Sequence, residues 1–170
     1  QLQIFGLHAA RLDIREDASR FNAAVGEILR GLGIHPDFEH ASGEERLALL
    51  QNLLTRVPPD LAPHPGVTPE TAEIWALFQL ISRARKVYGS ALLGPVVVSM
   101  TKHAADLLSV LLLAHWTGGA DGMDLAPLFE TMQALADAPH ILHTLFQSPA
   151  YNAHLQTCAN HQILMIGYSD

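Results

Sequence analysis

The chain has 170 residues, of which 49% are hydrophobic and 16% are charged, a balance that excludes an intrinsically disordered protein. There are 10 lysines and arginines against 17 aspartates and glutamates, so the formal net charge is −7 and nucleic acid or an anionic membrane is an unsuitable partner. Cys158 is the single cysteine, which excludes an internal disulfide and fits a cytoplasmic protein. The longest apolar run, Leu107–Trp116, is about half of the roughly 20 residues that a transmembrane helix needs, so no membrane span is expected.

The first half of the chain predicts one strand followed by helices. A short aliphatic run predicts a buried strand at His8–Arg15. Apolar residues at helical spacing predict a helix over Ser19–Leu32, and a capping box at Ser42 predicts the start of a second helix that ends at Arg56. The proline-rich segment 57–68 predicts an irregular connector. A third helix is expected from Thr68 to Val87, with proline in its first turn.

The second half of the chain alternates predicted strands with predicted helices. Its strands are short aliphatic runs without strict alternation, which is typical of strands buried on both faces. Pro139 predicts a break within one of the helices. The expected elements are a strand at Pro95–Met100, a helix at Lys102–Trp116, a strand at Asp124–Glu130, two helical pieces over Thr131–Gln147, a short helix at Ser148–Ala159 and a strand at Gln162–Asp170.

This order of elements predicts a parallel α/β fold. The connections between predicted strands are long enough for helical crossovers, which are right-handed when they join parallel strands. Because the carboxyl ends of parallel strands share one edge of the sheet, we expect Arg15, Met100, Glu130 and Asp170 to lie on that edge. Four strand–helix units are half of an eight-stranded barrel. Residues 1–170 are therefore expected to be a single partial domain, a fragment of a larger barrel.

The charged residues at this edge could bind a metal ion and an anionic ligand. Two carboxylates, Glu130 and Asp170, can converge on a hard divalent cation such as Mg²⁺ or Mn²⁺. The planar guanidinium of Arg15 matches the oxygens of a phosphate or a carboxylate. A cation and an arginine in one pocket suit a phosphorylated or enolate-forming small acid. The alternative is that each charge only ends a strand and pairs locally at the rim.

Five short motifs resemble, in order and in spacing, successive signatures of the phosphoenolpyruvate carboxylase family. They are LDIR (12–15), SM (99–100), ADLL (105–108), APLFET (126–131) and MIGYSD (165–170). The resemblance implies a helix-rich (β/α)₈ barrel of the TIM type and a cytoplasmic lyase that fixes carbon dioxide. Such an enzyme uses Mg²⁺ or Mn²⁺ to join bicarbonate to phosphoenolpyruvate. The products are oxaloacetate, a tricarboxylic acid cycle compound, and phosphate, formed through carboxyphosphate and a metal-stabilised enolate.

The resemblance also implies roles for individual residues. Arg15 is expected to contact the substrate phosphate and to act in catalysis, while Glu130 and Asp170 are expected to be the protein ligands of the metal. Leu128 and Met165 match residues that line an apolar pocket for carbon dioxide. The isolated piece is expected to be inactive, because the family's other catalytic groups belong to the rest of the parent chain. The family is typically tetrameric, so a homo-oligomer is a further expectation.

Two other functions remain open at this level. The piece could be a non-catalytic half-barrel that self-associates through its open sheet edges. It could also belong to another metal-dependent barrel enzyme that acts on phosphoenolpyruvate or pyruvate, although five motifs in order argue against this.

Individual residues also have alternatives. A salt bridge with Asp13 or Glu16 is the alternative role of Arg15, and Asp106 is interpreted as a structural partner of an arginine or lysine on a neighbouring strand. His140, His143, His154 and His161 invite a zinc site, but solvated helix histidines are the favoured interpretation.

Overall fold

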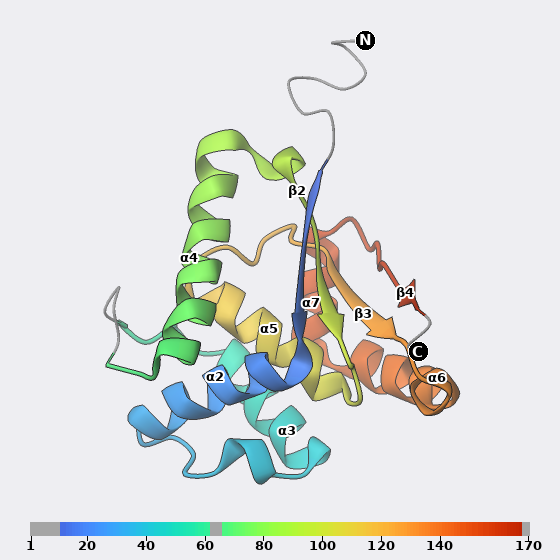
Figure 1. Cartoon of the computed structure of the whole chain (residues 1–170), viewed down its shortest axis with the longest axis horizontal. Helices are drawn as coiled ribbons and strands as arrows, with labels where there is room; N and C mark the ends of the chain where they lie inside the picture. Colours follow the sequence, from blue (N-terminus) through green and yellow to red (C-terminus); the bar gives the residue numbers. More distant parts are fainter. Residues whose placement is uncertain (1–10, 62–65, 168–170) are drawn as a thin grey trace.

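The computed structural model describes residues 11–61 and 66–167. Figure 1 shows the strands as arrows that run in a common direction, with helices packed beside them. The strands are β1 (Leu12–Asp17), β2 (Leu93–Ser99), β3 (Leu125–Phe129) and β4 (Met165–Ile166). The α-helices are α2 (Ala18–Gly31), α3 (Gly43–Leu54), α4 (Pro69–Tyr88), α5 (Ala104–Trp116), α6 (Met132–Gln147) and α7 (Pro149–Thr157), and 3₁₀ turns occur at Phe38–His40 and Ser90–Leu92.

The strands pair in the order β1-β2-β3-β4, and every pair is parallel. This confirms the predicted parallel α/β fold. The sheet is open: the described residues form four neighbouring strands and no closed barrel. Helices fill each connection because a parallel pair needs a long crossover to return the chain to the same end of the sheet.

Side-chain caps mark the start of several of the helices. Ser42 forms the predicted capping box, in which its Oγ accepts from Glu45 N at 3.2 Å and its own N–H donates to the Glu45 carboxylate at 2.9 Å. Asp17 caps α2 by accepting from Ser19 N at 2.7 Å, and Thr131 caps α6 in the same way. Each cap satisfies backbone N–H groups that a helix leaves without intrahelical partners.

Two sequence-based boundaries were wrong. Pro139 does not divide the helix over 131–147, because α6 is continuous with the proline inside it. Pro139 lies on an exposed part of α6, so water can reach the backbone groups that the ring leaves unpaired. The last predicted strand, Gln162–Asp170, is reduced to Met165–Ile166, which pair only with Leu128 and Phe129 of β3. Residues 168–170 of that prediction lie outside the described residues.

The first strand also ends later than predicted. β1 continues past Arg15 to Asp17, because Glu16 and Asp17 pair in register with Val98 and Ser99 of β2. The predicted start of this strand at His8 lies outside the described residues.

The sheet has two apolar faces. Val96, Val98 and Leu125 belong to the main core, which also contains the buried side chains of α2, α4 and the almost wholly buried α5. Val97, Ala126 and Leu128 form a smaller cluster on the other face, next to the partly buried Ile163 and Met165. Burial on both faces explains why these strands lack hydrophobic–polar alternation. None of the helices in the described ranges is long and apolar enough to cross a bilayer.

Candidate active site

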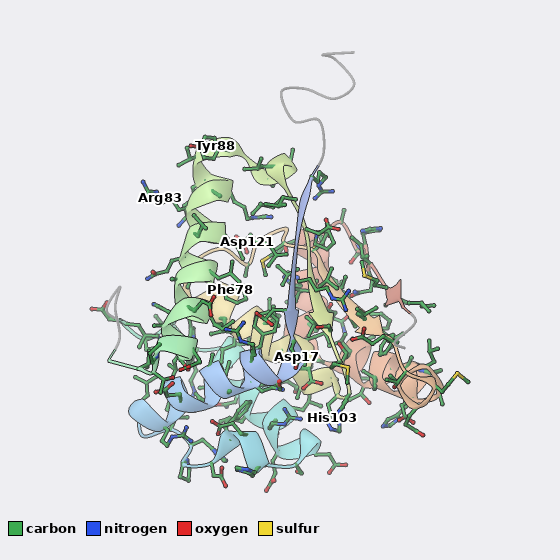
Figure 2. The ribbon with its side chains drawn as sticks, viewed as in Figure 1. Asp17, Phe78, Arg83, Tyr88, His103 and Asp121 are labelled. Carbon is green, nitrogen blue, oxygen red and sulfur yellow. The ribbon has the colours of Figure 1, made fainter. Side chains whose placement is uncertain are left out.

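The carboxyl ends of the strands lie at one edge of the sheet, as the parallel topology requires. Figure 2 shows Asp17 at the end of β1 and His103 just before α5 near this edge, whereas Tyr88 lies toward the opposite end of the molecule. Arg15 is in register with Val97, and Val97 with Ala126, so Arg15 lies on the sheet face of the smaller apolar cluster. This face, near the strand ends, is the candidate site.

Arg15 and Glu130 meet across the sheet edge. The guanidinium Nη2 of Arg15 donates to Glu130 Oε2 at 3.1 Å, although the two residues are 115 positions apart. The Arg15 side chain is 58% exposed and that of Glu130 is 13% exposed. Arg15 therefore does not pair with Glu16, which forms an ion pair with Arg20 instead. The structure brings together two of the predicted site residues.

A backbone group from the intervening strand completes this arrangement. Met100 N donates to the other carboxylate oxygen of Glu130, Oε1, at 3.1 Å. Met100 directly follows β2 and has φ = 55°, a left-handed conformation that is uncommon for a residue with a side chain. The ends of β1, β2 and β3 thus converge on one carboxylate. This backbone donor carries no side-chain signal in the sequence, which is why sequence reasoning missed its role.

Leu128 and Met165 lie beside the charged pair and are in register with each other on β3 and β4. Leu128 is buried, Met165 is partly buried, and both belong to the smaller apolar cluster. Gly167 N donates to Phe129 O at 3.1 Å, and a Cβ placed at Gly167 would lie 3.1 Å from Leu128 Cδ1 and 3.5 Å from Glu130 Cβ. The backbone after β4 therefore packs closely against the Leu128–Glu130 segment. Asp170, the other predicted ligand, lies outside the described residues.

The histidine-rich helices have no such arrangement. Among residues 11–61 and 66–167, no group of three or more histidine, cysteine, aspartate or glutamate side chains is placed to hold a metal ion. Burial lowers the pKa of His154, which lies 3.7 Å from Cys158 Sγ through its Nε2 atom. Burial also raises the pKa of the Cys158 thiol, which makes it a poor nucleophile.

Comparison with known proteins identifies the family. The family model described as phosphoenolpyruvate carboxylase matches residues 1–170. The chain belongs to the phosphoenolpyruvate carboxylase family. The relatives named phosphoenolpyruvate carboxylase include one from Gloeobacter violaceus, 36% identical over 182 residues, and one from Thermus sp. (strain 71), 39% identical over 175 residues. A third, from Roseiflexus castenholzii, is 34% identical over 175 residues.

The match covers the chain completely but its relatives only in part. Each of these alignments spans 100% of this chain and 19% of the relative. The chain is thus similar to about one fifth of a phosphoenolpyruvate carboxylase, and the family predicted from five short motifs is confirmed over its whole length.

Proposed function

We propose that this chain supplies one part of the active site of a phosphoenolpyruvate carboxylase, which joins bicarbonate to phosphoenolpyruvate to give oxaloacetate and phosphate. The observation that carries the proposal is the meeting of Arg15 and Glu130 at the carboxyl ends of parallel strands. The largely buried Glu130 carboxylate suits a divalent cation, and the exposed Arg15 guanidinium suits the phosphate of a small acid.

Glu130 fits the role of a metal ligand for Mg²⁺ or Mn²⁺. Its carboxylate offers hard oxygen atoms, and each oxygen that accepts one hydrogen bond from Met100 or Arg15 keeps a further lone pair. Asp170 is the second proposed ligand; it follows β4, the neighbour of the strand that ends before Glu130. When bound, the cation supplies positive charge that favours enolate formation.

Arg15 suits the substrate phosphate. One of its nitrogen atoms bonds Glu130, while the side chain is 58% exposed and has other N–H donors to offer. The guanidinium stays charged at any physiological pH, so it can offset phosphate charge throughout the reaction. We propose that Arg15 is a catalytic residue that holds the phosphate while bicarbonate attacks it.

The apolar neighbours suit the second half of the reaction. Carbon dioxide carries no charge, and the enolate that captures it must be kept from protonation by water. Leu128 is buried and is in register with the partly buried Met165, so their hydrocarbon groups lie side by side next to Glu130. We propose that these two side chains line the carbon dioxide pocket, where the exclusion of water protects the enolate.

The rest of the parent chain is the main proposed partner. The open four-stranded sheet is half of the strand number of a (β/α)₈ barrel, and we propose that further strands close it into a TIM-type barrel. The parent enzyme is proposed to be cytoplasmic and homo-oligomeric. The piece by itself is proposed to be inactive.

The second candidate is self-association of the isolated piece. Within the described residues β1 and β4 each pair on one side only, and Leu12 and Ile166 on these strands are 66% and 73% exposed. Such edges favour pairing with another copy. Light scattering on the isolated chain tests this: a dimer supports self-association, and a monomer at high concentration contradicts it.

Substitution of Glu130 tests the proposed function in the full-length protein. Glu130→Gln keeps the shape of the side chain but removes its charge, and we expect kcat/KM for phosphoenolpyruvate carboxylation to fall on the order of 100-fold at fixed Mn²⁺. Glu70→Gln, on the exposed first turn of α4, is the matched control and should leave turnover unchanged. Turnover of Glu130→Gln within about twofold of the unsubstituted protein would contradict the proposal.

A further inference from the structure

A buried polar cluster lies behind the candidate site, between the helices and the end of β2. Its side chains are Asn22, Arg46, Asp106 and Ser109, which come from α2, α3 and α5 and are each 9% exposed or less. Such groups are costly to bury unless they are hydrogen-bonded to one another. The cluster lies next to the turn that follows β2, and it forms hydrogen bonds with that turn.

Asp106 is the centre of this cluster and is 2% exposed. Its Oδ1 atom accepts from Asn22 Nδ2 at 2.8 Å and from Arg46 Nη1 at 3.3 Å. The sequence-based expectation of a structural pairing is thus confirmed, but the partner lies on a helix and not on a neighbouring strand. The Arg46 guanidinium also lies over the ring of Phe38, with its Cζ atom 5.9 Å from the ring centroid.

The other carboxylate oxygen of Asp106 accepts hydrogen bonds from the backbone. Its Oδ2 atom accepts from Lys102 N at 2.9 Å and from His103 N at 2.8 Å. These N–H groups belong to the turn that joins β2 to α5, so Asp106 ties this turn to the helical core. Because Oδ1 is held from two other helices, Oδ2 has little freedom to move.

The same turn is also tied to β2. Thr101 Oγ1 donates to Val98 O at 2.7 Å, and Thr101 is fully buried. Met100 directly precedes the attached residues Thr101, Lys102 and His103, and its left-handed backbone directs its N–H to Glu130 Oε1 at 3.1 Å. A left-handed non-glycine residue persists only where the surrounding structure holds it. The attachments at Thr101 and at Lys102–His103 are what hold it here.

We propose that Asp106 is a positioning residue for Glu130, acting through the β2–α5 turn and the backbone N–H of Met100. Asp106 does not touch the substrate or the cation; it sets the place of the N–H group that orients the Glu130 carboxylate. The inference rests on the proposed function, since it treats Glu130 as a metal ligand. Groups that orient a ligand in this way commonly tune metal affinity.

The test compares two ways of damaging the same cluster in the full-length protein. Asp106→Asn removes the charge that holds Arg46 and the turn. Ser109→Ala removes only the bond from Ser109 Oγ to Asn22 Oδ1, 2.7 Å long, and leaves the four bonds to Asp106 in place. Asp106 makes four of these hydrogen bonds and Ser109 one, so a purely structural role predicts that any change in Mn²⁺ binding follows the loss of stability in each variant. A positioning role predicts that Mn²⁺ binding weakens in the Asp106 variants and not in Ser109→Ala. Mn²⁺ binding is measured directly by electron paramagnetic resonance, beside the thermal unfolding midpoint.

We expect Asp106→Asn to weaken Mn²⁺ binding about tenfold and Ser109→Ala to change it less than about twofold, while both lower the unfolding midpoint. Asp106→Glu provides a second variant, because it keeps the negative charge but displaces the carboxylate by one methylene. It should weaken Mn²⁺ binding as well, and it decides the question if Asp106→Asn does not fold.

Two results would overturn the inference. One is unchanged Mn²⁺ binding in the folded Asp106 variants, and the other is equal weakening by Ser109→Ala. Glu130→Gln separates this failure from that of the proposed function. If it abolishes Mn²⁺ binding while the Asp106 variants bind normally, only the positioning role is wrong. If Glu130→Gln also binds Mn²⁺ normally, the proposed metal site and the positioning role fail together.

Discussion

Substitution of Arg15 should affect catalysis strongly and stability weakly, although Arg15 forms an ion pair with Glu130. Arg15→Met removes the guanidinium but keeps most of the hydrocarbon stem. The Arg15 side chain is 58% exposed, and ion pairs at such sites contribute about 0–1 kcal/mol to the free energy of unfolding. Glu130 would keep its hydrogen bond from Met100 N. We therefore expect the free energy of unfolding to fall by less than about 1 kcal/mol.

The expected loss of activity is much larger. If Arg15 holds the phosphate, its loss should lower kcat/KM about 10²- to 10³-fold, which corresponds to roughly 2.7–4 kcal/mol of transition-state stabilisation. Steady-state carboxylation by the full-length protein measures this effect, and urea unfolding of the same protein measures the free energy of unfolding. The kcat/KM of Arg15→Lys should lie between those of the unsubstituted protein and Arg15→Met, because lysine keeps the charge but lacks the planar guanidinium.

Arg83→Met is the matched control for this substitution. Arg83 is an exposed arginine on α4, and Figure 2 shows it at the opposite side of the molecule from Asp17 and His103. It should leave both readouts unchanged. The reasoning would be refuted if Arg15→Met kept kcat/KM within about twofold, or if it lowered the free energy of unfolding by more than about 2 kcal/mol.

Further predictions concern stability and protonation. A Cβ at Gly26 would lie 2.3 Å from Glu39 Cδ, whereas one at Gly31, the last residue of α2, meets nothing within 4 Å. Gly31→Ala should therefore stabilise the protein by about 0.4–1 kcal/mol, by reducing the freedom of the unfolded chain, and Gly26→Ala by less. In a protein that already carries Glu39→Ala, Gly26→Ala should stabilise α2 as much as Gly31→Ala does. Hydrogen exchange of the α2 amides measures these changes in stability. Equal effects of Gly26→Ala and Gly31→Ala when Glu39 is present would contradict the clash. The pKa of His154 is lowered by burial, and that of His40 is raised by the side-chain hydrogen bond to the aspartate three residues before it. Exchange of the imidazole C2 hydrogen, followed by mass spectrometry, should give a lower midpoint for His154 than for His40, and the reverse order would contradict it. Because the unfolded chain binds the His154 proton more readily, this residue should reduce folded-state stability as the pH falls below its ordinary pKa of 6.5.

Local sequence signals predicted most of the secondary structure. Capping at Ser42 was identified correctly because the capping box involves residues only three positions apart. The proline in α6 was misjudged because its effect depends on whether the unpaired backbone groups face solvent, which is a property of the packed helix. The short β4 was overestimated because its pairing with β3 extends over only two residues, Met165 and Ile166.

The sequence by itself determined the family, the parallel α/β class and the gathering of Arg15, Met100 and Glu130 at one edge of the sheet. These follow from motif order, hydrophobic patterning and the rule that parallel strands end together. Only the tertiary structure decided which atoms meet there. The contacts of Glu130 with Arg15 and Met100 span 115 and 30 positions, and that of Asp106 with Asn22 spans 84. Such contacts depend on strand register and on the left-handed backbone of Met100, and both are set by packing between segments that are distant in the chain.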